Sequence, residues 1–164
     1  MKLKRLILLV IMIGAVLAVP TVGAQTSDTA YGEYEGVIES LDGKWAVVSG
    51  LRIKVNKTQL DDDIDRLYVG LGVEIDFKLK NGKFKALYID DDDDDDYYED
   101  DQGELTGTIT RLVPNKSMVI GGMKFKIKKA EIDDDAPMFV GGRPDVEFYP
   151  KKFTKMIATD IDDD

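Results

Sequence analysis

Apolar and polar residues alternate in three short stretches of the chain. Leu, Ile and Val alternate with basic residues in 51–55, and apolar residues alternate with acidic ones in 73–77. Met, Phe and Ile alternate with lysines in 123–127. A period of two is typical of strands that bury one face. These stretches therefore predict β-strands that turn one face to a core and the other to water.

Turn-forming pairs separate the predicted strands. Asn81-Gly82 lies between two such stretches and is the strongest hairpin signal in the chain. A short helical turn is also predicted in each part of the chain. Ile64, Leu67 and Tyr68 have helical spacing after three aspartates, and Pro137 suits a first helical turn after three more.

The second part of the chain repeats the first. Four blocks recur in the same order, at an almost constant offset along the chain. The matching blocks are 36–38 with 107–109, 49–55 with 121–127, 73–77 with 144–148, and 86–90 with 158–162. This order indicates a tandem duplication. We take 32–90 and 103–162 as the two repeats, and 91–102 as an acidic linker.

Each repeat is long enough for one small barrel. Five or six short strands and at most one helical turn in about 60 residues predict an antiparallel β-barrel of the OB or SH3-like kind. The predicted fold class is therefore all-β, with two such barrels in tandem after an N-terminal signal-peptide helix.

The turn glycines and core positions resemble those of a known family. The residues that carry the resemblance are Gly36-Val37-Ile38, Gly50 to Val55, Thr58, Val69 to Ile75, and Ala86 to Ile89. They are similar to a family of small exported bacterial β-barrel domains of unknown function, often found in tandem. The second repeat departs from this pattern at Arg143-Pro144. The resemblance implies a fold and export, and it supplies no catalytic residues.

The segment 1–24 has the pattern of a cleavable export signal. Lys2, Lys4 and Arg5 precede an uncharged apolar stretch over 6–19, and Val22-Gly23-Ala24 places small residues before the expected cleavage point. A membrane span needs roughly 20 apolar residues, more than this stretch provides, so an uncleaved anchor is the less favoured alternative. The expected location is periplasmic or extracellular, in soluble form after cleavage.

Composition then narrows the possible chemistry. The chain has no Cys and no His, which excludes disulfides, thiol nucleophiles and His-dependent mechanisms. Acidic residues outnumber basic ones by 32 to 22, and the net charge is −10. Loss of the signal would remove three positive charges and leave −13. This balance argues against nucleic acid and against direct docking to an anionic membrane.

Aspartates carry the distinctive chemistry. An apolar residue followed by three aspartates occurs at 60–63, 89–92, 132–135 and 161–164, and the first two sites map onto the last two at an offset of 72. The candidate metal ligands are Asp61, Asp62, Asp63, Asp90, Asp91, Asp92, Asp93, Asp94, Asp133, Asp134, Asp135, Asp162 and Asp163.

A hard divalent cation would relieve the repulsion between these carboxylates. Ca²⁺ takes 6–8 oxygen ligands in flexible cages, and the chain has no His or Cys for softer metals. There is no EF-hand pattern, so the expected affinity is weak, on the order of 10⁻⁴–10⁻³ M as in extracellular modules.

Simpler interpretations of the aspartates stay open at this point. The groups at 61–63 and 133–135 could cap a helical turn. The run from 90 to 101 could be a solvated linker, and 162–164 a frayed tail. Trp45 and Tyr97-Tyr98 could form a sugar-stacking surface, although a single Trp at a strand start is more often part of a core.

The sequence therefore predicts a non-enzymatic exported binding or structural module whose Asp clusters bind Ca²⁺ weakly. The alternative is a metal-independent protein-interaction module of the cell envelope. A carboxylate-based hydrolase is less favoured, because no acid pair stands out among 32 acids. The partner could be a protein, a glycan or a mineral surface.

Overall fold

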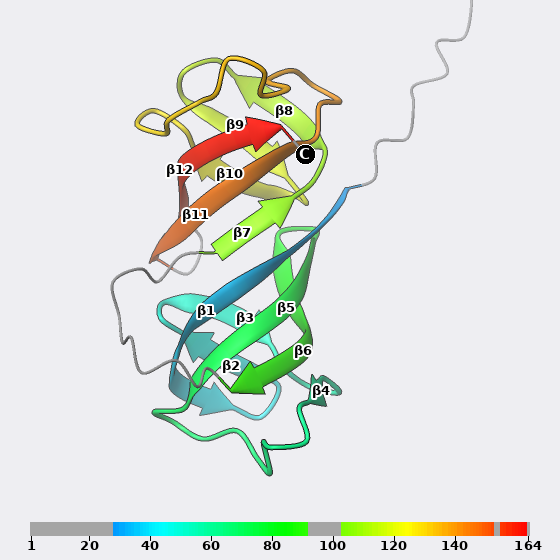
Figure 1. Cartoon of the computed structure of the whole chain (residues 1–164), viewed down its shortest axis with the longest axis vertical. Helices are drawn as coiled ribbons and strands as arrows, with labels where there is room; N and C mark the ends of the chain where they lie inside the picture. Colours follow the sequence, from blue (N-terminus) through cyan, green and yellow to red (C-terminus); the bar gives the residue numbers. More distant parts are fainter. Residues whose placement is uncertain (1–27, 92–102, 153–154, 164) are drawn as a thin grey trace, which may run out of the picture.

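The structure is a computed structural model that describes residues 28–91, 103–152 and 155–163. Within these ranges the chain forms twelve strands and no helix, which confirms the all-β prediction (Figure 1). None of the described residues belongs to a helix that could cross a membrane. The predicted signal peptide, 1–24, and the linker residues 92–102 lie outside the described residues.

The strands fall into two sets of six, here called the first half and the second half. The first half contains β1 (Thr29–Asp42), β2 (Trp45–Val48), β3 (Leu51–Lys54), β4 (Gln59–Leu60), β5 (Gly72–Lys80) and β6 (Lys83–Asp91). The second half contains β7 (Gly103–Thr106), β8 (Ile109–Val113), β9 (Ser117–Ile120), β10 (Met123–Lys126), β11 (Pro144–Lys152) and β12 (Lys155–Asp163).

Five strands of the first half pair in a ring. The order is β1-β2-β3-β6-β5 and back to β1, and only the β3–β6 contact in this ring is parallel. β1 closes the ring because it is long: residues 29–37 pair with β5, and residues 38–42 pair with β2, with a bulge between Ile38 and Ser40. A five-stranded ring of this kind is the architecture of an OB-like barrel.

The second half has the same order of pairings with one interruption. β7 pairs with β11, and β8 pairs with β9, so two short strands stand where β1 is continuous. Bonds at Ile109 bridge the gap: its N–H donates to the Gly142 oxygen at 2.8 Å, and its oxygen accepts from the Gly141 N–H at 2.9 Å. The parallel contact is β10–β12, and Pro144 is the first residue of its strand.

The predicted helical turns are wrong. The Ile64 N–H donates to the Asp61 oxygen, and the Ala136 N–H donates to the Asp133 oxygen, each at 3.2 Å, so each site is a single tight turn. In the first half, Asp61 Oδ1 also accepts from the Asp63 N–H at 3.2 Å. The same bond forms at helix N-caps, but residues 65–71, which follow it, form no helix. The aspartates at 61–63 and 133–135 therefore have no helix to cap.

The two halves join through their first strands. β1 and β7 run antiparallel and side by side in Figure 1, with Glu33 opposite Glu104. Gly32 lies opposite Leu105, and a Cβ at Gly32 would stand 1.9 Å from the Glu104 carbonyl oxygen. Only glycine permits this approach. The junction makes one continuous twelve-stranded sheet.

One core serves both halves. All the buried apolar residues form a single cluster, with Phe148 of β11 near its middle. The Phe148 ring lies 6.1–6.3 Å from three rings of the first half, those of Tyr34, Phe77 and Phe84, and 5.5 Å from Phe125 of its own half. Aromatic rings at such distances add to the stability gained from burial.

Candidate metal centre

In both halves, one backbone hydrogen bond brings the aspartates of the long loop to the last strand. The Asp61 N–H donates to the Ile89 oxygen at 2.9 Å, and the Asp133 N–H donates to the Ile161 oxygen at 3.1 Å. Each loop therefore begins beside the end of β6 or β12, where further aspartates stand. Acidic groups that are far apart in the sequence meet on one side of each half.

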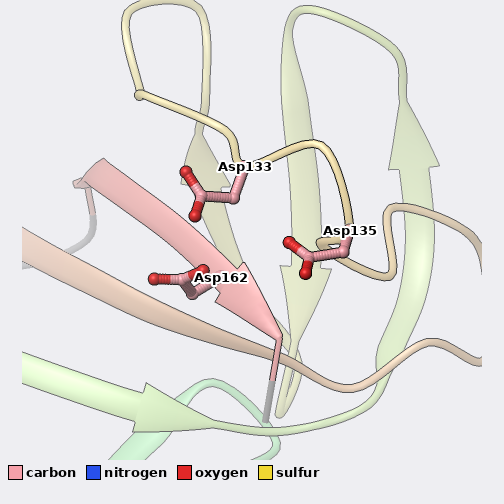
Figure 2. A group of neighbouring side chains, drawn as sticks. All are labelled: Asp133, Asp135 and Asp162. Atoms are coloured by element: carbon pink, nitrogen blue, oxygen red, sulfur yellow. The ribbon is translucent and has the colours of Figure 1, made fainter.

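The second half gathers three carboxylates. One carboxylate oxygen from each of Asp133, Asp135 and Asp162 lies within 4.8 Å of the others, and all three residues are exposed. Figure 2 shows the first two on the loop and the third on β12, with their carboxylates gathered between the two elements. Among the described residues, this is the one group of three acids close enough to hold an ion.

The first half arranges its equivalent residues differently. The hydroxyl of Tyr88 on β6 donates a hydrogen bond to Asp61 Oδ2. By the offset between the two repeats, the residue at the matching position in β12 is Asp160. One half therefore places a hydrogen-bond donor where the other places a fourth carboxylate.

The pKa shifts follow from this difference. Asp133 has a raised pKa, caused first by a hydrogen bond with Asp162 and then by the charges of Asp162 and other acids, together with some burial. Asp61 has a lowered pKa, caused first by the hydrogen bond from Tyr88. The same bond raises the pKa of Tyr88 to about 12. Burial and then the charge of Asp61 raise the pKa of Asp90. Only the second half collects carboxylates without a matching donor.

The other predicted ligands lie outside the three-carboxylate group. Asp62 and Asp134 are exposed in the loops, and Asp163 is exposed at the end of its strand. Asp91 is half-buried at the end of β6. The candidates Asp92, Asp93 and Asp94 lie outside the described residues.

The structure reveals a further row of acids that spacing along the chain conceals. Strand pairing sets Asp76, Glu33, Glu104, Glu147 and Asp160 opposite one another in turn across five strands. Each acid has a non-acidic residue on both sides in its own strand, so no acidic run marks the row in the sequence. Like charges directly opposite are destabilising.

Hydrogen bonding and burial alter the acids in and beside this row. Glu104 has a raised pKa, caused first by a hydrogen bond with Asp145. Glu74 has a raised pKa, caused first by burial and then by its acidic neighbours. A small hollow of about 80 Å³ has Asp160 and Asp162 in its lining, so this row reaches the three-carboxylate group.

Trp45 is not a core residue. It is half-buried on the outer face of β2, outside the core cluster, and the guanidinium carbon of Arg52 lies 4.3 Å from the ring centroid. The predicted companions Tyr97-Tyr98 lie outside the described residues.

Comparison with known proteins supports the domain type of the first half. A family described as a domain of unknown function (DUF5666) matches residues 35–90. A solved structure, "drosophila Unr CSD456", is similar over 80% of this chain, with 15% identity and a TM-score of 0.34. The match spans 62% of that chain. No curated protein matches. The expected similarity to a domain of unknown function is thus shown for the first half.

Proposed function

We propose that this chain is an exported, non-enzymatic module of two OB-like units in tandem, and that its second unit binds Ca²⁺. The ligands are Asp133, Asp135 and Asp162. The observation that carries the proposal is their geometry, with oxygens from all three carboxylates within 4.8 Å of one another. The N-terminal signal pattern supports export, and the repeated order of strand pairings supports the tandem.

The spacing and the chemistry suit calcium. Ca²⁺ binds oxygen at about 2.3–2.6 Å, so two oxygens on one ion stand at most about 5 Å apart. Three exposed carboxylates leave the remaining coordination positions to water and to neighbouring oxygens. An open site of this kind has weak affinity, on the order of 10⁻⁴–10⁻³ M.

The raised pKa of Asp133 shows why an ion would stabilise this site. In the absence of a cation, Asp133 holds its proton more tightly because Asp162 lies beside it. A divalent cation bound between these carboxylates would favour their ionised forms and remove the repulsion. In the first half the Tyr88 hydroxyl already satisfies Asp61, so the first half gains less from an ion.

Calorimetry and thermal melts of the purified protein test the proposal. We expect a heat of binding and a higher melting temperature at roughly 5–10 mM Ca²⁺, well above the expected dissociation constant. Asp133→Asn should abolish both effects without destabilising the calcium-free protein, because it removes a repelling charge. Asp134→Asn is the matched control: it changes an exposed acid in the same loop and should keep both effects.

Two results would contradict the proposal. One is an absence of both heat and thermal shift with the unsubstituted protein. The other is an unchanged calcium response in Asp133→Asn, which would place the ion elsewhere.

A further inference from the structure

The junction between the halves has approximate twofold symmetry. Glu33 of β1 lies opposite Glu104 of β7, and these two residues match one another at an offset of 71 along the chain. The two flanking pairs match each other at the same offset with the halves exchanged: Gly32 with Leu105, and Gly103 with Tyr34. In the core, Phe77 and Phe148 match in the same way, and their rings lie 6.3 Å apart. Contacts made by the first half are thus returned by matching residues of the second.

Each half also sets the hairpin of its last two strands against a turn of the other half. The Gly82 N–H, in the turn between β5 and β6, donates to the Gly121 oxygen, in the turn between β9 and β10, at 2.7 Å. In the reciprocal contact, a Cβ at Gly50 would stand 3.7 Å from Pro150 Cγ of β11. An interface that uses the same patch on both sides is isologous, and such an interface closes as a pair.

One position makes the junction specific for unlike halves. A Cβ at Gly121 would stand 2.6 Å from Leu79 Cγ, so the second half needs glycine there. The matching residue of the first half is Ser49, which carries a Cβ. Two first halves in the same arrangement would set Ser49 against Leu79, and this clash selects against that pairing. The junction therefore joins a first half to a second half.

We propose that this junction also forms between two copies of the chain, so that the first half of each copy binds the second half of the other. β1 of one copy then pairs with β7 of the other, in the register that Figure 1 shows within one chain. The exchanged pair makes every contact of the junction twice. The proposal uses the proposed tandem of two units and does not use calcium, because all three proposed ligands belong to the second half.

The connection between the halves decides which copy supplies the partner. Asp91 ends β6 and Gly103 begins β7, and β5 and β1 lie between these two strands in the sheet. Three strand spacings separate them, about 14 Å along the sheet. The connecting residues 92–102 can span at most about 40 Å, so one chain can close on itself. Closure within one chain has an effective concentration on the order of millimolar, so the parent protein should be monomeric at micromolar concentration.

Deletion of residues 92–101 tests the proposal. The one residue left between Asp91 and Gly103 spans at most about 7 Å, which is too short to connect β6 with β7 of the same chain. The effective concentration for closure within one chain then falls to near zero, and the second half must come from another copy. Light scattering should give twice the mass of one chain at roughly 10 µM, where the parent protein gives the mass of one chain.

A replacement of the same ten residues by Gly and Ser is the matched control. It removes the same acids and keeps the length of the connection. It should remain monomeric at the same concentration, because closure within one chain is still possible. The comparison separates the loss of length from the loss of negative charge.

A disulfide shows which strands meet in the dimer. The chain has no cysteine, and Glu33 lies opposite Glu104. One preparation of the shortened chain carries Glu33→Cys and the other carries Glu104→Cys. Unfolded together in urea, refolded and mildly oxidised, they should give a covalent dimer, because directly opposite strand residues are close enough for a disulfide. Glu33→Cys refolded alone should give several-fold less, because the clash between Ser49 and Leu79 disfavours two first halves.

The outcomes either support the proposal or overturn it. A shortened chain that is folded and monomeric would overturn it, and a mass above two chains would contradict a closed pair. An equal yield of covalent dimer from Glu33→Cys alone would show that the junction does not select unlike halves. If the shortened chain does not fold, the same cysteine variants of the full-length chain are refolded together at roughly 1 mM, and absence of the cross-link there also refutes the exchange. A failure of the calcium site leaves all these results unchanged.

Discussion

At matching positions, the two halves of the molecule have similar buried residues and different exposed ones. Phe77 and Phe148 hold matching positions in β5 and β11, and their rings lie 6.3 Å apart in one core. On the surface, Tyr88 of the first half stands where the second half has Asp160. Lys85 stands where it has Ile157. The shared core preserves the fold, and the exposed positions are free to give each half a separate surface chemistry.

The two halves arrange the charged residues on their surfaces differently. The first half pairs its loop aspartate with a tyrosine hydroxyl and collects cations on the outer face of its strands. The second half collects three carboxylates, and Ile157 lies opposite Lys126 where the first half pairs Lys85 with Lys54. The clearest difference therefore lies where the loop aspartates meet the last strand of each half. Three predictions test how far the halves are joined and how far they differ.

The largest effect is expected at Phe148. Its replacement by Ala removes a buried ring that contacts three rings of the other half, and should lower the free energy of unfolding by about 3–5 kcal/mol. Because one core serves both halves, they should melt together in a single transition, measured by calorimetry and by urea unfolding.

Phe139→Ala is the matched control for this prediction. Phe139 is 59% exposed in the loop before β11, so its loss should change the free energy of unfolding by less than about 0.5 kcal/mol. Two separate transitions in Phe148→Ala, with the first half unaffected, would show that the halves fold independently.

An exchange of Tyr88 and Asp160 tests the difference at the carboxylate groups. Asp160→Tyr places a hydroxyl beside Asp133 and should weaken calcium binding several-fold, because Asp133 gains a donor and the site loses a charge. Tyr88→Asp frees Asp61 and should add a weak calcium-binding heat in the first half. Calorimetry with each single variant measures both effects. Equal calcium binding in both variants would mean that the residue at this position does not cause the difference in calcium binding between the halves.

The smallest effect is the pH dependence of stability. Four acids have raised pKa values in the folded chain: Asp133, Glu104, Glu74 and Asp90. Their contribution to stability is present at low pH and is lost as the pH rises through these raised values. Asp61 acts in the opposite sense: its contribution is present above its ordinary pKa and is lost as the pH falls through the lowered one.

Four raised pKa values against one lowered value predict that acidification stabilises the calcium-free protein. Its melting temperature should rise as the pH falls from 7 toward the ordinary carboxyl pKa of about 4, with a smaller rise in Glu104→Gln. A melting temperature that falls over this range would show that the repulsion among these acids is weaker than the geometry implies.

Much of the architecture could be predicted from local patterns. The alternation in 51–55, 73–77 and 123–127 matches β3, β5 and β10, and Asn81-Gly82 forms the turn between β5 and β6. The helical turns were predicted wrongly, because three residues at helical spacing are too few to outweigh the cost of nucleating a helix. Short helical patterns therefore fail where no longer amphipathic stretch supports them.

The candidate site was only partly visible in the sequence. Repeated aspartates pointed to Asp133, Asp135 and Asp162, since the same offset places them in each repeat. Nothing in the spacing distinguished these three from the other candidates. Tyr88 also gave no signal, because its hydroxyl reaches Asp61 only through the parallel pairing of β4 with β6.

The sequence by itself determined most of the strands and hairpin turns, because alternation and turn chemistry act over a few residues. The tertiary structure alone decided which charges meet. Contacts between β1, β5, β6, β7 and β11 join residues far apart in the chain, and their register sets lysine opposite lysine and acid opposite acid. Surface electrostatics depends on distance in space, and strand pairing fixes that distance.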